Sequence, residues 1–155
     1  MVTLVALYEL PYFVRNILAA LMLDGHKDAA TVLALEGNLG AGKTTFVQTL
    51  ARELGVGEVV QSPTYVLMKN YPLELSTAGA NTNKKFTKLV HIDAYRLESP
   101  EEFDALRPEE FLNDPGCLVV VEWPERLGSK LPAPDMTLTF SAENMTEGER
   151  DITAV

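Results

Sequence analysis

The sequence predicts a single α/β domain over residues 1–155, with a mixed, mostly parallel sheet flanked by helices. A strand pattern, a glycine-rich turn and an amphipathic helix follow one another within residues 31–54. The apolar segments 88–95 and 117–122 have the length and composition of buried strands. A length of 155 residues also fits one domain of ordinary size.

The first half of the chain alternates helix and strand patterns. Residues 9–24 repeat apolar side chains at helical spacing, and Gly25 follows where a C-terminal cap belongs. Residues 31–35 (TVLAL) predict a short buried strand. Residues 43–54 return to helical spacing and end before Gly55.

The second half contains strands separated by polar connections. The small, polar segment 72–85 is interpreted as a hairpin loop, and residues 100–113 carry acidic helix patterns. The segments 135–140 and 150–154 are interpreted as an antiparallel pair that closes the sheet. The strands expected before this pair are 64–71, 88–95 and 117–122.

Composition narrows the classes of protein. The net charge is −9, which disfavours an unassisted grip on a nucleic-acid backbone. Cys117 is the single cysteine, so the chain has no internal disulfide and no cysteine-based metal site. The longest apolar run, residues 17–23, is far shorter than the roughly 20 residues of a membrane span. We therefore expect an acidic, cytoplasmic globular protein without a membrane segment.

The segment 37–44 reads GNLGAGKT and matches the pattern G-x-x-x-x-G-K-[ST] in full. Its glycines allow the backbone to wrap around phosphate oxygens. Its backbone amides lie at the N-terminus of the following helix, which favours an anion. Lys43 is predicted to reach the β- and γ-phosphates of a nucleotide, and the Thr44 hydroxyl to bind Mg²⁺. The expected strand before the motif and helix after it support this interpretation.

Acidic residues at strand ends are the candidates for metal binding and catalysis. Glu122 ends the apolar run 117–122, so we expect it to bind Mg²⁺ together with Thr44. His91, Asp93 and Tyr95 alternate and share one face of a strand. Asp93 is the best candidate to orient the attacking water or to support Mg²⁺, with His91 as an alternative base.

Several other residues can have either a functional or a purely structural role. Arg96 can pair with a phosphate or with Glu98. The segment 62–65 (SPTY) is either a loop that senses the γ-phosphate or a simple strand entry. Trp123 can lie against a purine or belong to the core.

Four segments together resemble the TsaE (YjeE) family, small bacterial P-loop ATPases needed for threonylcarbamoyl-adenosine modification of tRNA. The resemblance covers about residues 9–150, and the four motifs occur in the family's order. Only the first motif is specific by itself, whereas the combination is highly specific. The segments are GNLGAGKTT at 37–45, SPTY at 62–65, HIDAYRL at 91–97 and VVEWPERL at 120–127.

The resemblance implies roles for individual residues. ATP or ADP is the expected nucleotide, Thr44 and Glu122 are the expected Mg²⁺ ligands, and Lys43 and Asp93 are the expected catalytic residues. Thr64 becomes a switch residue and Trp123 a side chain near the nucleotide. The implied nucleotide-binding set is Asn38, Leu39, Gly40, Ala41, Gly42, Lys43, Thr44, Thr45, Thr64 and Trp123.

The resemblance also implies partners. TsaD and TsaB are the proteins to which TsaE binds, and TsaE is expected to use ATP to allow the complex repeated turnovers. The tRNA is then contacted only indirectly, through the complex. The segment 72–85 is longer than expected for the family, and the C-terminus stops early.

Three other functions share a phosphate-binding loop. A small-molecule kinase needs arginines in a lid, and only Arg107 and Arg126 are available in the corresponding stretch. A regulatory GTPase usually carries Asn-Lys-x-Asp, and residues 83–86 (NKKF) lack the aspartate. A nucleotide-gated assembly module with slow hydrolysis is compatible with the resemblance. We expect the isolated chain to be a weak ATPase, because no arginine in cis is evident for the transition state.

Overall fold

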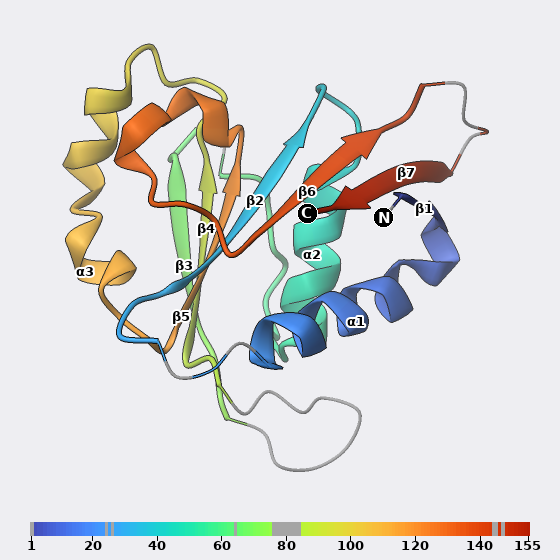
Figure 1. Cartoon of the computed structure of the whole chain (residues 1–155), viewed down its shortest axis with the longest axis horizontal. Coiled ribbons are helices and arrows are strands. Elements are labelled where there is room, and N and C mark those ends of the chain that lie inside the picture. The colour runs from blue at the N-terminus through green and yellow to red at the C-terminus, as the bar shows by residue number, and fades with distance from the viewer. Residues whose placement is uncertain are drawn as a thin grey trace.

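The computed structural model describes residues 2–23, 25, 27–63, 65–75, 85–143, 146 and 148–155 (Figure 1). Within them the chain forms an α/β domain whose strands make one mixed sheet, which confirms the predicted fold class. No helix in this part of the chain combines the length and apolarity that a membrane span requires. The strands are β1 (Val2–Ala6), β2 (Thr31–Gly37), β3 (Met68–Pro72), β4 (Lys88–Asp93), β5 (Cys117–Glu122), β6 (Met136–Ser141) and β7 (Glu149–Ala154). The α-helices are α1 (Leu10–Leu23), α2 (Lys43–Glu53) and α3 (Glu109–Leu112), and short 3₁₀ helices span Leu7–Glu9, Pro100–Leu106, Pro124–Arg126 and Gly128–Lys130.

The sheet has the strand order β1-β7-β6-β2-β5-β4-β3. Its centre is parallel, since β2 pairs with both β5 and β6, and β5 pairs with β4. The outer pairs β1–β7, β6–β7 and β3–β4 are antiparallel. The parallel centre places the carboxyl ends of β2, β5 and β4 along one edge, where α/β proteins commonly bind ligands.

Helices cover both faces of this sheet. On one face, α1 and α2 pack on alternate strand residues such as Leu33 and Val120. On the other face, Val32 and Val119 pack against Phe103 of the 3₁₀ helix Pro100–Leu106 and against Phe111 of α3. Figure 1 shows α3 on the side of the sheet away from α1 and α2. Because both faces are covered, β5 is an uninterrupted buried strand, as its apolar sequence predicts.

Most predicted elements are confirmed, and the acidic helix patterns within residues 100–113 form two separate short helical elements. They are the 3₁₀ helix Pro100–Leu106 and the short helix α3. Between them, Arg107 has a left-handed backbone with φ 51°. The residue before a proline avoids the helical region, so Pro108 interrupts the helical pattern at this point.

The N-terminal strand β1 was not predicted, and the strand predicted at 64–71 begins later, at Met68. The backbone turns before β3, since the amides of Val66 and Leu67 both donate to the carbonyl of Pro63. Thr64 itself lies outside the described residues. The antiparallel pairing of β3 with β4 agrees with the predicted hairpin, although residues 76–84 of the expected loop also lie outside the described residues.

Phe46 offers a test of the packing that holds α2 on the sheet. Its ring is fully buried and meets Phe13 and Phe140 edge-on, at centroid distances of 6.4 Å and 5.6 Å. We expect Phe46→Ala to lower the free energy of unfolding by about 3–5 kcal/mol. The substitution would leave a cavity between α1, α2 and β6, which cannot easily collapse because each element is held by its own packing. Urea denaturation measures this loss, with Leu23→Ala (side chain 85% exposed) as the control. A loss under about 1 kcal/mol would contradict this packing.

Candidate functional site

The candidate site lies at the carboxyl edge of the parallel strands. Glu122, the last residue of β5, is in register with Leu35 of β2 and with Asp93, the last residue of β4. The glycine-rich segment 37–42 begins at the end of β2 and leads into α2. The sheet therefore brings the phosphate-binding motif and the two predicted acids to one place.

Two glycines of the loop are required by its geometry. Gly37 has φ 139°, and a Cβ at this residue would lie 2.5 Å from the carbonyl oxygen of Phe140. Gly42, the N-cap of α2, has φ 105°, and its carbonyl accepts the amide of Phe46 at 3.0 Å. Side chains at either residue would be strained, so the loop can follow this path only with glycine.

Lys43 is buried at the centre of the site, with only 4% of its surface exposed. Its ammonium contacts the carbonyl oxygen of Gly37 and donates to that of Asn38 at 3.0 Å. Nζ also lies 4.2 Å from the centroid of the Trp123 ring. Burial lowers the pKa of Lys43 from its ordinary value, and the nearby charge of Glu122 opposes that shift. The loop thus holds a cation whose present partners are its own carbonyls.

Glu122 is a buried carboxylate with two side-chain partners. The Thr44 hydroxyl donates to its Oε1 at 3.2 Å, and His91 Nε2 lies 2.8 Å from the same oxygen. His91 is fully buried and Glu122 is 3% exposed. A hydroxyl from α2 and an imidazole from β4 therefore fix the orientation of the carboxylate.

Hydrogen bonds from Ser62 and Tyr95 help to hold Asp93 at the end of β4. The Ser62 hydroxyl donates to Oδ2 at 3.1 Å, and the backbone amide of Tyr95 donates to Oδ1 at 3.0 Å. Ser62 therefore brings the predicted switch segment to the site. Thr64 lies outside the described residues, so the switch role of that residue stays a prediction.

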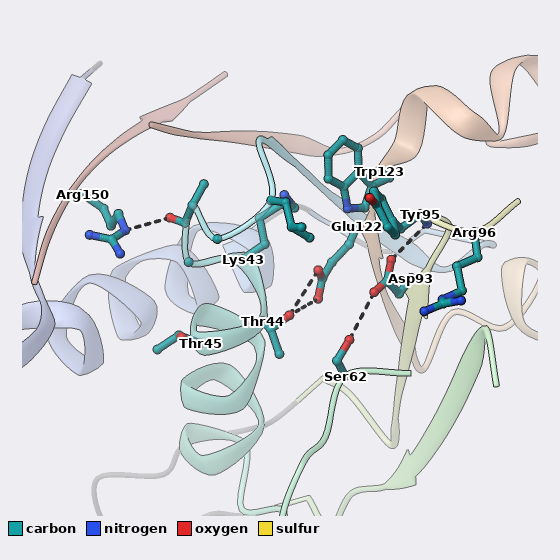
Figure 2. A pocket seen from close by; sticks show the side chains of 14 residues that line it. Lys43, Thr44, Thr45, Ser62, Asp93, Tyr95, Arg96, Glu122, Trp123 and Arg150 are labelled. Carbon is teal, nitrogen blue, oxygen red and sulfur yellow. Dashed lines mark hydrogen bonds between the residues drawn. The ribbon is translucent and has the colours of Figure 1, made fainter. Parts of the chain in front are cut away.

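These side chains surround one cavity of about 400 Å³ (Figure 2). Lys43 and Thr44 lie near its middle, with Arg150 toward one end and Arg96 toward the other. Among the described residues, the lining contains the predicted nucleotide-binding, metal-binding and catalytic residues except Asn38, which contributes its carbonyl to Lys43. The lining residues are Leu39, Gly40, Ala41, Gly42, Lys43, Thr44, Thr45, Ser62, Asp93, Tyr95, Arg96, Glu122, Trp123 and Arg150.

Arg150 is a site residue that sequence reasoning missed. It lies on β7, and its Nε donates to the carbonyl of Ala41 at 3.1 Å. Arg96, for which two partners were open, stacks on the Tyr65 ring with 4.6 Å between the guanidinium carbon and the centroid. No ion pair joins Arg96 to Glu98 in the described structure. Two arginines in cis therefore line the cavity, of which the sequence indicated only Arg96 as a candidate phosphate partner.

Comparisons with known proteins agree with this geometry. The model of the family "Threonylcarbamoyl adenosine biosynthesis protein TsaE" matches residues 14–152. The chain belongs to the TsaE family. The tRNA threonylcarbamoyladenosine biosynthesis protein TsaE of Treponema pallidum (strain Nichols) is 37% identical over 126 residues, covering 81% of this chain and 82% of that protein. The protein of the same name from Bacillus subtilis (strain 168) is 36% identical over 125 residues, covering 80% and 70%.

A solved structure is also similar to this TsaE-family chain. The crystal structure of YdiB from Bacillus subtilis superposes with a TM-score of 0.63 and 26% sequence identity. The superposition covers 99% of this chain and 86% of that one. The likeness therefore extends beyond the phosphate-binding loop to the outer strands.

In this TsaE-family chain, His91 lies behind Glu122 and does not line the cavity. The predicted common face of His91 and Asp93 is correct, but only Asp93 reaches the open end of the strand. The geometry therefore gives His91 a positioning contact with Glu122 and does not support its alternative role as the base.

The oxygen atoms of the site fit a magnesium ion that is shared with a nucleotide. Thr44 Oγ1 and the Glu122 carboxylate are 3.2 Å apart and face the same cavity. No group of three or more His, Cys, Asp or Glu residues in the described segments could hold a metal by itself. Mg²⁺ keeps several waters and commonly binds through one or two protein oxygens and substrate phosphates, so this donor set is sufficient.

The contact between His91 and Glu122 can be tested through stability. We expect His91→Phe to lower the free energy of unfolding by about 2–4 kcal/mol, because it leaves a buried carboxylate without one partner. In the double variant with Glu122→Leu, most of this loss should disappear, giving a coupling of about 1–3 kcal/mol. Urea denaturation of the four proteins measures the coupling. Losses that add to within about 0.5 kcal/mol would show that the two side chains act independently.

Proposed function

We propose that this chain binds ATP with Mg²⁺ and hydrolyses it as the ATPase component of tRNA threonylcarbamoyladenosine synthesis. The observation that carries the proposal is the arrangement of Lys43, Thr44 and Glu122 around one cavity at the carboxyl edge of the sheet. The family and the names of the relatives supply the tRNA modification.

The loop provides the phosphate site. Backbone amides of residues 38–45 surround the phosphates at the N-terminus of α2, where the helix favours an anion. The Lys43 ammonium exchanges its bonds to the carbonyls of Gly37 and Asn38 for the β- and γ-phosphates. Lys43 then balances the charge that develops during phosphoryl transfer.

The metal and the attacking water lie on the strand side of the cavity. Thr44 and Glu122 would hold Mg²⁺, which would supply positive charge to neutralise the phosphates. Asp93, oriented by Ser62 and the Tyr95 amide, holds the attacking water or the metal's water shell. Thr64 completes the proposed site as the switch residue that senses the γ-phosphate.

Weak hydrolysis by the isolated chain is part of the proposal. Arg150 donates to the carbonyls of Ala41 and Glu149, and Arg96 stacks on Tyr65, so both guanidinium groups already have partners inside the protein. TsaD and TsaB are the proposed partners, and their binding would change these contacts. With a net charge of −9, the chain would reach tRNA only through the complex. A cytoplasmic location belongs to the same proposal.

Phosphate release from ATP tests the proposed function. The purified chain alone should hydrolyse ATP slowly, and adding the TsaD–TsaB pair should stimulate it strongly. Lys43→Ala should lower the stimulated rate about 100-fold, because it removes the buried cation of the phosphate site. Fast, equal hydrolysis with and without the pair would point to a self-sufficient enzyme. ATP binding without hydrolysis in both cases would favour a nucleotide-gated assembly module.

The metal assignment has its own test. Glu122→Gln keeps the side-chain shape but removes the negative charge, so half-saturation with Mg²⁺ should need about tenfold more metal. Titrating Mg²⁺ against fixed ATP, with bound nucleotide as the readout, measures this shift. Glu125→Gln is the matched control, because Glu125 is exposed and does not line the cavity. An unchanged titration for Glu122→Gln would assign the metal to another acid.

A further inference from the structure

The two arginines that line the cavity have different surroundings. Arg150 is fixed by hydrogen bonds, because its Nε donates to the carbonyl of Ala41 and its Nη1 donates to the carbonyl of Glu149. Arg96 is exposed, and among the described residues its guanidinium forms no hydrogen bond and no ion pair. Its contact there is the face of the Tyr65 ring. The N–H donors of Arg96 are therefore available to a ligand, whereas those of Arg150 are partly used.

Arg96 also lies at the end of the cavity where the proposed function puts the attacking water. Figure 2 shows Asp93 and Arg96 toward one end and Arg150 toward the other. A water oriented by Asp93 attacks the γ-phosphate, so that phosphate has to lie within reach of this end. Negative charge spreads over the γ-phosphate oxygens during transfer, and a guanidinium can donate two parallel N–H groups to such oxygens. Position and available donors both favour Arg96 over Arg150.

The Tyr65 ring is held next to Arg96 through Asp93. On the N-terminal side of Tyr65, the Ser62 hydroxyl donates to Asp93 Oδ2 at 3.1 Å. On its C-terminal side, the carbonyl of Leu67 accepts the backbone amide of Asp93 at 3.0 Å. Tyr65 is thus tied on both sides to Asp93, three residues before Arg96. The acid that would orient the water also fixes the ring that contacts the arginine.

The contact with Tyr65 keeps the guanidinium at the rim of the cavity. Tyr65 is 87% exposed and does not line the cavity, whereas Lys43 and Thr44 mark its middle. A guanidinium that rests on this ring is therefore drawn away from phosphates in the loop. The contact is also weak, because an exposed cation–π interaction shifts an equilibrium by only about two- to fivefold. Arg96 can thus leave the ring at little cost.

We propose that Arg96 is a catalytic residue that contacts the γ-phosphate in the transition state of ATP hydrolysis, and that Tyr65 is a latch that holds Arg96 at the rim of the cavity. The inference rests on the proposed function, because it needs ATP in the loop. The latch contributes a few-fold to the slow hydrolysis expected of the isolated chain.

The role of Arg96 in the reaction is electrostatic. The water oxygen bonds to the γ-phosphorus while the bond from that phosphorus to the β–γ bridging oxygen breaks, and ADP leaves with the electron pair of that bond. One proton of the water stays on the inorganic phosphate, and the other passes by way of Asp93 to solvent. Arg96 keeps its own proton throughout and donates N–H bonds to the γ-phosphate oxygens.

Substitution of Arg96 tests the catalytic contact. In single-turnover hydrolysis by the full chain, Arg96→Ala should lower the rate at saturating ATP about tenfold or more. ATP affinity should change by less than about threefold, because the contact forms mainly in the transition state. Arg52→Ala is the matched control, because Arg52 is exposed on α2 and does not line the cavity. An unchanged rate for Arg96→Ala, or a loss confined to ATP affinity, would overturn the catalytic contact.

Substitution of Tyr65 tests the latch. Tyr65→Ala should raise the same rate about two- to fivefold, because more of the protein then has Arg96 away from the rim. Tyr65→Phe keeps the ring and should behave as the unaltered chain, and Tyr65→Ala should have no effect once Arg96 is alanine. Tyr8→Ala is the matched control, since Tyr8 is 84% exposed and does not line the cavity. A lower or unchanged rate for Tyr65→Ala, or an equal rise without Arg96, would overturn the latch.

Lys43→Ala separates this inference from the proposed function. If the unaltered chain hydrolyses ATP and Lys43→Ala does not, the phosphate site stands, and the Arg96 and Tyr65 variants then decide the inference by themselves. If both proteins release phosphate equally, or neither releases any, the proposed function itself fails and the roles of Arg96 and Tyr65 fail with it.

Discussion

The buried carboxylate of Glu122 is the constraint on which the site depends. A carboxylate at 3% exposure is costly unless it is hydrogen-bonded and balanced by charge. Its partners come from two other elements, His91 of β4 and Thr44 of α2, and Lys43 supplies a nearby positive charge. These contacts require β5 to lie beside β4 with the start of α2 above its carboxyl end. The same arrangement carries Asp93 to the cavity, so satisfying one buried acid also assembles the site.

The loop is organised around a cation that already has partners. Lys43 binds the carbonyls of Gly37 and Asn38, so an incoming phosphate must replace these contacts as well as water. Breaking such bonds reduces the net gain from binding, but the lysine is already at the cavity and loses little conformational freedom on binding phosphate. Burial lowers the pKa of Lys43, and the nearby charge of Glu122 opposes that shift. The loop and Glu122 thus hold the Lys43 side chain in place before any ligand arrives.

Local patterns predicted the phosphate loop, Glu122 and Asp93, because a motif or a strand end marks each of them in the sequence. The contacts made over long separations were not predictable in the same way. Arg150 reaches Ala41 across 109 residues, and nothing near Arg150 in the sequence indicates that β7 would pair with the unpredicted β1. Alternation placed His91 on the face of Asp93, but its bond to Glu122 depends on which strand lies next to β4.

The outer antiparallel strands have a consequence for the site beyond completing the sheet. β7 pairs with β6 on one side and β1 on the other, and Arg150 is in register with Val5 of β1. Strand pairing therefore fixes Arg150 relative to the outer strands, and its bond to the carbonyl of Ala41 joins these strands to the loop. The outer strands formed by both ends of the chain therefore support the loop, although the motif that marks the site lies on β2 and α2.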